Sequence, residues 1–365
     1  MRVEDELLLL AVSAAIAAHR ARLGELLRAA DVERLIAELR RLRVLPVLGE
    51  RIAAHVEIPA ALRAAIDEDR RTNALHGMLA EALVQELTRA FDARGIPLLP
   101  LKGQALAAEA HGAGDMRDST DIDVLVPVER LFDAARLLEE LGYRVSSTGP
   151  DLPSLHVMAA HRTQARPAVE LHWRIHWYER DWSRRLLDTS VPGPDGVRRA
   201  APPLALMALL AYHARDAFAG LRLLADIVGY AERHPELLAG DAVAQEVART
   251  PALAPAVHAA AAAVRAVSGL HIPGLGERLT RRQRLAVRLA DPWQRSSFDQ
   301  RIAVTHLVDG LLTPPGGMRA YLGERLTMFP TPRENALHLA KTGVRWVGAL
   351  RPGAPTVPVR RPPRS

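Results

Sequence analysis

The chain of 365 residues contains no cysteine, and this absence removes several kinds of chemistry. Without thiols it can form no disulfide, no thiolate zinc site and no cysteine nucleophile. Any bound metal must therefore be held by oxygen or imidazole ligands. Lysine is scarce as well, because Lys102 and Lys341 are the only lysines among 48 basic residues. An ammonium group is a compact point charge that arginine does not reproduce, so both positions merit separate attention.

Long apolar runs are also missing from the sequence. The longest, at 7–18 and 252–264, are shorter than the roughly 18 to 20 residues that span a bilayer. Glu4, Asp5 and Glu6 precede the first run, whereas a secretory signal begins with basic residues. We therefore expect a cytoplasmic protein without a membrane span. With 48% hydrophobic and 25% charged residues, the composition is that of a globular protein.

The hydrophobic patterns predict an α+β fold in which a small mixed sheet is flanked by helical regions. Leucine and alanine recur at helical spacing through residues 1–91. Within a core at 92–182, short apolar runs bounded by turn residues predict strands at 96–103, 121–126, 143–146 and 168–175, with a weaker strand at 155–160. Helices are expected at 104–110 and 128–141. Residues 183–350 again have a helical composition.

The C-terminal segment 351–365, "RPGAPTVPVRRPPRS", is basic and rich in proline. Such a composition predicts an extended, disordered tail. The tail is either a solvated end or a contact site for nucleic acid or an acidic partner. Nucleic-acid binding has weak support, since no recognisable reading module accompanies the tail.

The stretch "DSTDIDVLVP" at 118–127 places two acids in a strand that otherwise looks buried. Side chains alternate between the faces of a strand, so Asp121 and Asp123 share one face while Ile122 and Val124 share the other. Two converging carboxylates repel each other, and in an apolar setting they need a compensating charge. Because hard oxygen ligands suit Mg²⁺ or Mn²⁺, a divalent metal is a natural partner.

A third acid lies in the predicted strand "ARPAVELHWRI" at 165–175. Alternation turns Glu170 away from its apolar neighbours and places it beside His172. Two aspartates and a third carboxylate from another strand are the ligand set for two Mg²⁺ ions in phosphoryl transfer. Asp121, Asp123 and Glu170 are therefore the predicted metal ligands and catalytic residues, with Glu170 also helping to remove the proton of the attacking hydroxyl. His172 is a candidate supporting residue beside Glu170.

The phosphates of a substrate need backbone amides and cations. Gly103 follows a predicted strand and precedes a predicted helix, where amide groups and the helix dipole favour an anion. Lys102 and Arg117 add positive charge near this turn. Lys102 can equally be an exposed lysine at the end of a strand, and Arg117 can be an ion-pair partner of the aspartates.

These motifs together resemble the nucleotidyltransferase superfamily of DNA polymerase β. The resemblance is closer to a bacterial family of uncharacterised nucleotidyltransferases with the pattern "LKG…R…DIDVLV…VELHW…H…D". The matching segments here are 101–103, Arg117, 121–126 and 169–173, followed by "LLAYHARDAF" with His213 and "LRLLADIVGY" with Arg222 and Asp226. Gly103 is followed by Gln104 instead of the serine or glycine usual in the wider superfamily, and it lies farther from Asp121.

The resemblance implies transfer of a nucleoside monophosphate from an NTP such as ATP, with release of pyrophosphate. It leaves the acceptor open among a hydroxyl of a small molecule, a peptide or an RNA. His213 and Asp226 are expected to shape the nucleotide pocket, although both can be structural residues and Asp226 can pair with Arg222. A second hypothesis is a non-catalytic nucleotide- or peptide-binding accessory protein that retains the fold.

Overall fold

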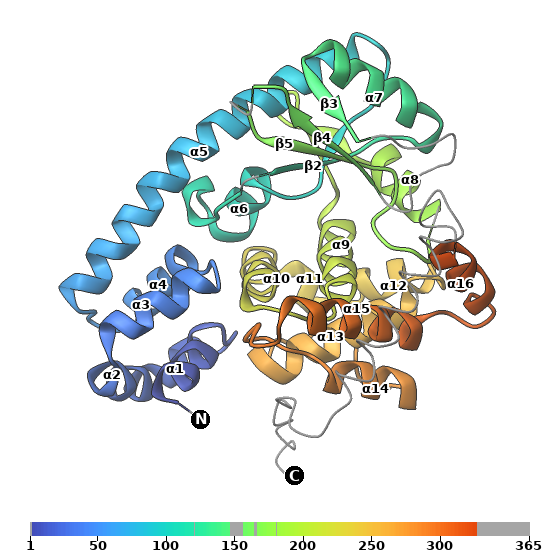
Figure 1. The fold of residues 1–365 in the computed structure, drawn as a ribbon. Coiled ribbons are helices and arrows are strands. Elements are labelled where there is room, and N and C mark those ends of the chain that lie inside the picture. The colour runs from blue at the N-terminus through green and yellow to red at the C-terminus, as the bar shows by residue number, and fades with distance from the viewer. Residues whose placement is uncertain (1, 120, 147–155, 164–165, 180, 327–365) are drawn as a thin grey trace.

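The computed structural model of the chain describes residues 2–119, 121–146, 156–163, 166–179 and 181–326. The predicted C-terminal tail lies outside these residues. Five elements precede the sheet: α1 (Val3–Ala11), α2 (Arg20–Ala29), α3 (Val32–Arg41), α4 (Leu45–Ala53) and α5 (Ala60–Asp92), with a short 3₁₀ turn at Ile16–His19. The 33-residue helix α5 runs from the N-terminal helices to the sheet (Figure 1).

The central sheet has five strands in the order β1-β2-β5-β4-β3. Only β2 and β5 pair in parallel; β1 with β2, β5 with β4, and β4 with β3 are antiparallel. The strands are β1 (Leu99–Pro100), β2 (Asp121–Leu125), β3 (Tyr143–Val145), β4 (His156–His161) and β5 (Ala168–His172). The helix α6 (Gln104–His111) and a 3₁₀ turn at Gly114–Met116 connect β1 to β2, and a 3₁₀ turn at Val128–Arg130 and α7 (Leu131–Glu140) connect β2 to β3.

One face of the sheet is apolar and closes a core of its own. Ile122, Val124, Val169 and Leu171 are buried in this cluster together with the last turns of α5 and with α7. Since these residues alternate with the acids along β2 and β5, burying them turns the acids to the opposite face. The apolar face therefore fixes the direction of the polar one.

Helices resume after the sheet and continue to the end of the described chain. They are α8 (Asp181–Asp188), α9 (Pro202–Arg215), α10 (Leu221–Arg233), α11 (Glu236–Ala239), α12 (Ala242–Ala248), α13 (Ala254–Ser268), α14 (Arg281–Arg288), α15 (Phe298–Leu312) and α16 (Met318–Leu326). A small hairpin of β6 (Val191–Pro192) and β7 (Arg198–Arg199) separates α8 from α9. No helix within the described part of the chain is long and apolar enough to cross a membrane.

A second hydrophobic core contains residues from the helices that precede the sheet in the sequence and from those that follow it. Leu7, Leu23 and Leu48 from the N-terminal helices belong to the same buried cluster as Leu210 and Val257 from the C-terminal ones. The two helical regions, which are separated by the whole sheet in sequence, thus share one core.

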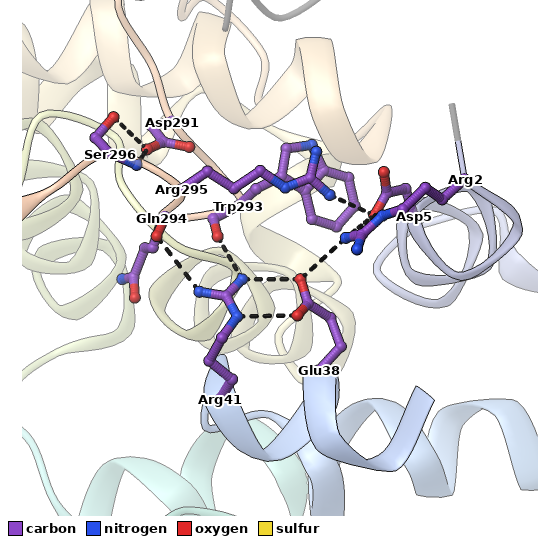
Figure 2. A network of polar contacts seen from close by, with 9 residues as sticks. All are labelled: Arg2, Asp5, Glu38, Arg41, Asp291, Trp293, Gln294, Arg295 and Ser296. Carbon is purple, nitrogen blue, oxygen red and sulfur yellow. Dashed lines mark hydrogen bonds and ion pairs between the residues drawn. The ribbon is translucent and has the colours of Figure 1, made fainter. Parts of the chain in front are cut away.

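Polar contacts join the same two regions at the surface (Figure 2). The Asp5 carboxylate accepts hydrogen bonds from Arg2 at 2.8 Å and from Arg295 at 2.6 Å. Arg41 forms a bidentate ion pair with Glu38 and also donates hydrogen bonds to the backbone carbonyls of residues 293 and 294. Burial opposes the charge of Asp5, but its two arginine partners outweigh burial and lower the pKa of this carboxyl. The network connects α1 and α3 to the segment before α15.

The α+β fold predicted from the sequence is confirmed, with a mixed five-stranded sheet flanked by helices. The first strand is shorter than predicted, since only Leu99–Pro100 pair with β2. The strand predicted at 168–175 corresponds to β5, and residues 173–175 lie beyond its end. The hairpin of β6 and β7 was missed, because two-residue strands have no alternation to detect.

The packing of α10 on α6 leads to a stability prediction. Gly229 of α10 lies so close to α6 that an added Cβ would be 2.6 Å from the Ala110 carbonyl oxygen and 2.8 Å from His111 Nδ1. A backbone carbonyl cannot rotate away, so the helices must separate. We expect Gly229→Ala to lower the free energy of unfolding by about 1 to 3 kcal/mol, the usual cost of overpacking, as measured by urea denaturation.

Gly24→Ala in α2 is the matched control, because its added Cβ would meet no atom nearer than Val56 Cγ1 at 3.8 Å. That substitution should leave stability unchanged or raise it by up to about 1 kcal/mol through helix propensity. Equal effects at the two glycines would contradict the close approach of α6 and α10.

Candidate active site

The register between β2 and β5 brings the predicted acids together. In this parallel pair Asp123 is opposite Glu170, and Asp121 is opposite Ala168. On the other side of β5, His156 of β4 is opposite His172. Because cross-strand partners share a face, Asp121, Asp123, Glu170 and both histidines project from the same polar side of the sheet.

Asp123 lies at the centre of this polar face and is buried. Its Oδ1 atom is 2.9 Å from His172 Nε2 and 3.5 Å from Lys102 Nζ. Burial raises the cost of its charge, but Lys102 and His172 outweigh burial and hold the pKa of Asp123 below its ordinary value. The carboxyl is therefore ionised at neutral pH. Lys102 is not the exposed lysine that was one reading of the sequence, since its side chain is only 15% exposed.

Glu170 lies between two imidazoles. Its Oε2 atom is 3.2 Å from His172 Nε2 and 3.9 Å from His156 Nε2. The hydrogen bond from His172 is the main reason that the pKa of Glu170 is lowered, and burial acts against it. Burial, together with the neighbouring His172, lowers the pKa of His156 to about 4. As strand alternation predicts, His172 lies beside Glu170, and it contacts Asp123 as well.

Asp121 has a different setting from Asp123. It is half-buried, and its carboxylate forms no hydrogen bond or ion pair with the residues that the structure describes. It opens onto a cavity of about 480 Å³, which Lys102, Gly103 and Ser119 also line. Helix α5 contributes mostly small and apolar residues to this cavity together with Arg70 and Glu81, and the β6–β7 hairpin contributes Arg199. Asp121 is thus a carboxylate available to a ligand from solvent.

Gly103 occupies the turn that leads into α6. Its φ of 87° lies in the left-handed region, which a residue with a side chain rarely adopts. It precedes the first turn of α6 and lines the same cavity as Asp121. The free amide groups of a helix N-terminus favour an anion there. The sequence prediction of a turn between strand and helix at this position is confirmed.

Helix α9 contributes two residues that the sequence reasoning missed. Lys102 Nζ lies 4.0 Å from the ring centre of Tyr212, and the Arg215 guanidinium lies 4.5 Å from the same centre. The Tyr212 ring also meets His172 edge-on at 6.5 Å between centres. Tyr212 and Arg215 are three residues apart, so helical periodicity could have grouped them once one of them was assigned to the site.

His213, predicted to bind nucleotide, lies elsewhere on α9. It is buried, and its ring packs edge-on against Phe218 at 5.6 Å between centres. Burial lowers the pKa of His213 to about 4, so its imidazole is neutral at pH 7. The structure brings its neighbour Tyr212, and not His213, to the acidic face of the sheet.

Arg117 and Asp226, both predicted to bind nucleotide, pair with each other. The Arg117 Nε atom donates to Asp226 Oδ2 at 3.0 Å, and His111 Nε2 lies 2.9 Å from Asp226 Oδ1. Burial opposes the charge of Asp226, but Arg117 and His111 lower its pKa to about 2. Arg222, considered as a partner of Asp226, donates instead to the backbone carbonyl of Asp118. The contacts of Asp226 with Arg117 and His111 tie α10 to the end of α6 and to the segment between α6 and β2.

The buried pair makes stability depend on pH. The pKa of this carboxyl falls from 3.8 in the unfolded chain to about 2 in the folded protein. The group therefore stabilises the folded state fully at pH values above 3.8, and this contribution is lost as the pH falls towards 2. We expect Asp226→Asn to lower the free energy of unfolding at pH 7 by at least about 2 kcal/mol. The difference from the unsubstituted protein should shrink from pH 4 downwards, as measured by urea denaturation at a series of pH values.

Asp92→Asn provides the control, because Asp92 is exposed at the end of α5. Its effect on unfolding should stay within about 0.5 kcal/mol over the same pH range. A pH-independent loss of stability in Asp226→Asn would contradict the assigned ion pair.

The chain is similar to a protein family and to a solved structure. The sequence profile of a family described as "Uncharacterised nucleotidyltransferase" matches residues 28–268, which is more than half of the chain. No curated protein is significantly similar. A crystal structure of an antigenic nucleotidyltransferase-like protein from Paracoccidioides brasiliensis is similar, with 16% sequence identity and a TM-score of 0.32 over 49% of this chain and 92% of that one. The chain belongs to the uncharacterised nucleotidyltransferase family.

Proposed function

We propose that the protein is an Mg²⁺-dependent nucleotidyltransferase that moves a nucleoside monophosphate from an NTP to a hydroxyl group and releases pyrophosphate. The observation that carries this proposal is the β2–β5 register, which sets ionised Asp123 beside Glu170 on one face. The family name supports the reaction class and implies an NTP substrate. We infer that Asp121, Asp123 and Glu170 are the catalytic residues.

The donor type of the three acids suits a hard divalent cation, while their ligand atoms do not all lie within 4.8 Å of one another. Asp121 has no partner among the described residues and opens onto the cavity, while Asp123 and Glu170 both have lowered pKa values. Carboxylate oxygens of this kind suit Mg²⁺ or Mn²⁺, and nucleotidyltransferases typically use divalent metals. When bound, the metal would neutralise the phosphate charge and lower the pKa of the acceptor hydroxyl, as in two-metal phosphoryl transfer.

The surrounding groups have roles that follow from their positions. Gly103 and the N-terminus of α6 line the cavity next to Asp121 and favour a phosphate group there. Lys102 supplies positive charge on the same side, within 3.5 Å of Asp123. Burial lowers the pKa of Lys102, and the nearby Asp123 carboxylate opposes this effect. Arg117, Asp226 and His213 would support the pocket from behind without contacting the phosphates.

The chemical step follows from these roles. The acceptor oxygen attacks the α-phosphorus, a new phosphorus–oxygen bond forms, and the bond to the pyrophosphate group breaks. Glu170 is positioned to accept the proton of the hydroxyl, and His172 holds its carboxylate at 3.2 Å. The acceptor is a hydroxyl of a small molecule, a peptide or an RNA.

Transfer should depend on the acids. We expect Asp121→Asn and Glu170→Gln each to lower Mg²⁺-dependent nucleotide transfer by at least about 100-fold, the scale associated with losing one electrostatic group in a reaction centre. The measurement uses each α-labelled NTP in turn with Mg²⁺, and it records both pyrophosphate release and label on a panel of small-molecule, peptide and RNA acceptors.

Asp92→Asn changes an exposed aspartate at the C-terminal end of α5 and should retain full activity in the same assay. Transfer that persists in Asp121→Asn and Glu170→Gln would overturn the assigned roles. If the unsubstituted protein transfers no nucleotide from any NTP, yet binds an NTP without Mg²⁺ in calorimetry, the non-catalytic accessory role replaces this proposal.

A further inference from the structure

Two histidines flank Glu170 in a way that nucleotidyl transfer does not require. Within the described residues, the set of metal-ligand atoms that all lie within 4.8 Å of one another comes from His156, Glu170 and His172, and not from the three acids. The rings of His156 and His172 lie 4.8 Å apart between centres and are tilted by 44°. The cluster therefore consists of two imidazoles and one carboxylate on adjacent strands.

Hydrogen bonding accounts for only part of this arrangement. His172 Nε2 can donate its single proton to Asp123 or Glu170, at 2.9 Å and 3.2 Å. His156 Nε2 lies 3.9 Å from Glu170 Oε2, which is beyond hydrogen-bond range. The Nδ1 atoms of both rings are buried and have no hydrogen-bond partner within the described chain. A neutral ring that bonds an ion through Nε2 carries its proton on Nδ1, and here this proton breaks no existing hydrogen bond at Nδ1 within the described residues.

The distances match those between ligands of one metal ion. With metal–nitrogen and metal–oxygen bonds of about 2.0 to 2.2 Å, two ligand atoms on a shared ion lie about 3 to 4 Å apart. The 3.2 Å and 3.9 Å separations around Glu170 Oε2 fall in this range. His156 is the more accessible partner, because its side chain is 32% exposed whereas that of His172 is fully buried. The exposed side of His156 also gives an ion a path of entry.

The donor types select the ion. Imidazole nitrogen suits Zn²⁺, Co²⁺, Ni²⁺ and Fe²⁺, whereas Mg²⁺ and Ca²⁺ prefer oxygen alone. Two histidines and one carboxylate with the remaining positions open form a familiar ligand set for such ions. Charge also permits a dication, since Lys102 pairs with Asp123, and Glu170 has no ion pair with an arginine or lysine among the residues that the structure describes.

We propose that His156, Glu170 and His172 bind a divalent first-row transition ion such as Zn²⁺. This site shares Glu170 with the proposed catalytic acids but does not require nucleotide transfer. On binding, the ring proton of neutral His172 moves from Nε2 to Nδ1, Nε2 exchanges its hydrogen bond to a carboxylate for a bond to the ion, and Glu170 contributes one oxygen. The polar face of the sheet then carries a site for a softer ion beside the oxygen ligands of Asp121 and Asp123.

The test uses the full-length protein without a histidine tag, stripped of metal by a chelator. Co²⁺ is titrated while the visible absorption is recorded, and Zn²⁺ is then added as a competitor. We expect one equivalent of Co²⁺ to bind, Zn²⁺ to displace it, and Mg²⁺ in large excess to leave it in place. His156→Gln and His172→Gln should each weaken Co²⁺ binding by at least about 100-fold, because loss of even a supporting group around a metal costs 10- to 100-fold.

His161→Gln is the matched control, since His161 is a half-buried histidine at the other end of the same strand β4. It should bind Co²⁺ as the unsubstituted protein does. Asp121→Asn should also keep full Co²⁺ affinity, so loss of transfer and loss of the ion are separable. If the buried substitution His172→Gln unfolds the protein by circular dichroism, His156→Gln decides the matter. Absence of binding up to about 1 mM Co²⁺, or equal binding in His156→Gln, would overturn the proposal.

Discussion

The parallel pairing of β2 with β5 is the constraint on which the site depends. Its register sets Asp123 directly opposite Glu170, so two carboxylates that repel each other are held on one face of a rigid sheet. That arrangement is stable only if positive charge or hydrogen-bond donors reach the same place. Lys102 arrives from the turn after β1, and His172 comes from β5 itself with contacts to both acids. A one-residue slip of β5 would turn Glu170 into the apolar core and remove the site altogether.

The helices around the sheet hold this arrangement from both sides. The apolar face is buried by the end of α5 and by α7, which prevents the strands from changing register without exposing Ile122 and Val169. On the polar side, Tyr212 of α9 lies against Lys102 and His172. Helix α9 belongs to the core that the N-terminal and C-terminal helices share, and the Asp5 and Arg41 contacts join the same regions at the surface (Figure 2). Helices far from the acids in sequence thus fix the positions of Lys102 and His172, which compensate the negative charge of the acids.

Local patterns in the sequence were sufficient to predict the fold class and the side of the strand on which each acid lies. Alternation along 121–126 and 168–172 depends only on the nearest neighbours, and the structure follows it. The register between β2 and β5 could not be read from either strand, because nothing in one strand specifies its offset relative to the other. Which residue of α9 reaches the acids depends on the rotation of the helix about its axis. Because α9 is apolar on most sides, periodicity could not show that Tyr212 and not His213 faces them. The pairing of Arg117 with Asp226 had no local signal either, because the two residues lie 109 positions apart in the sequence.

Glu170 has two kinds of neighbour, so the two proposed sites share this carboxylate. Towards β2 it faces the oxygen ligands of Asp123, which suit a hard ion and a phosphate substrate. Towards β4 it faces the nitrogen of His156, which suits a softer ion. An ion held by the two histidines would take one oxygen of Glu170 and leave fewer oxygens for a metal beside Asp121 and Asp123. The identity of the ion that occupies this edge of the sheet would therefore control whether Glu170 is free to accept a proton from an attacking hydroxyl.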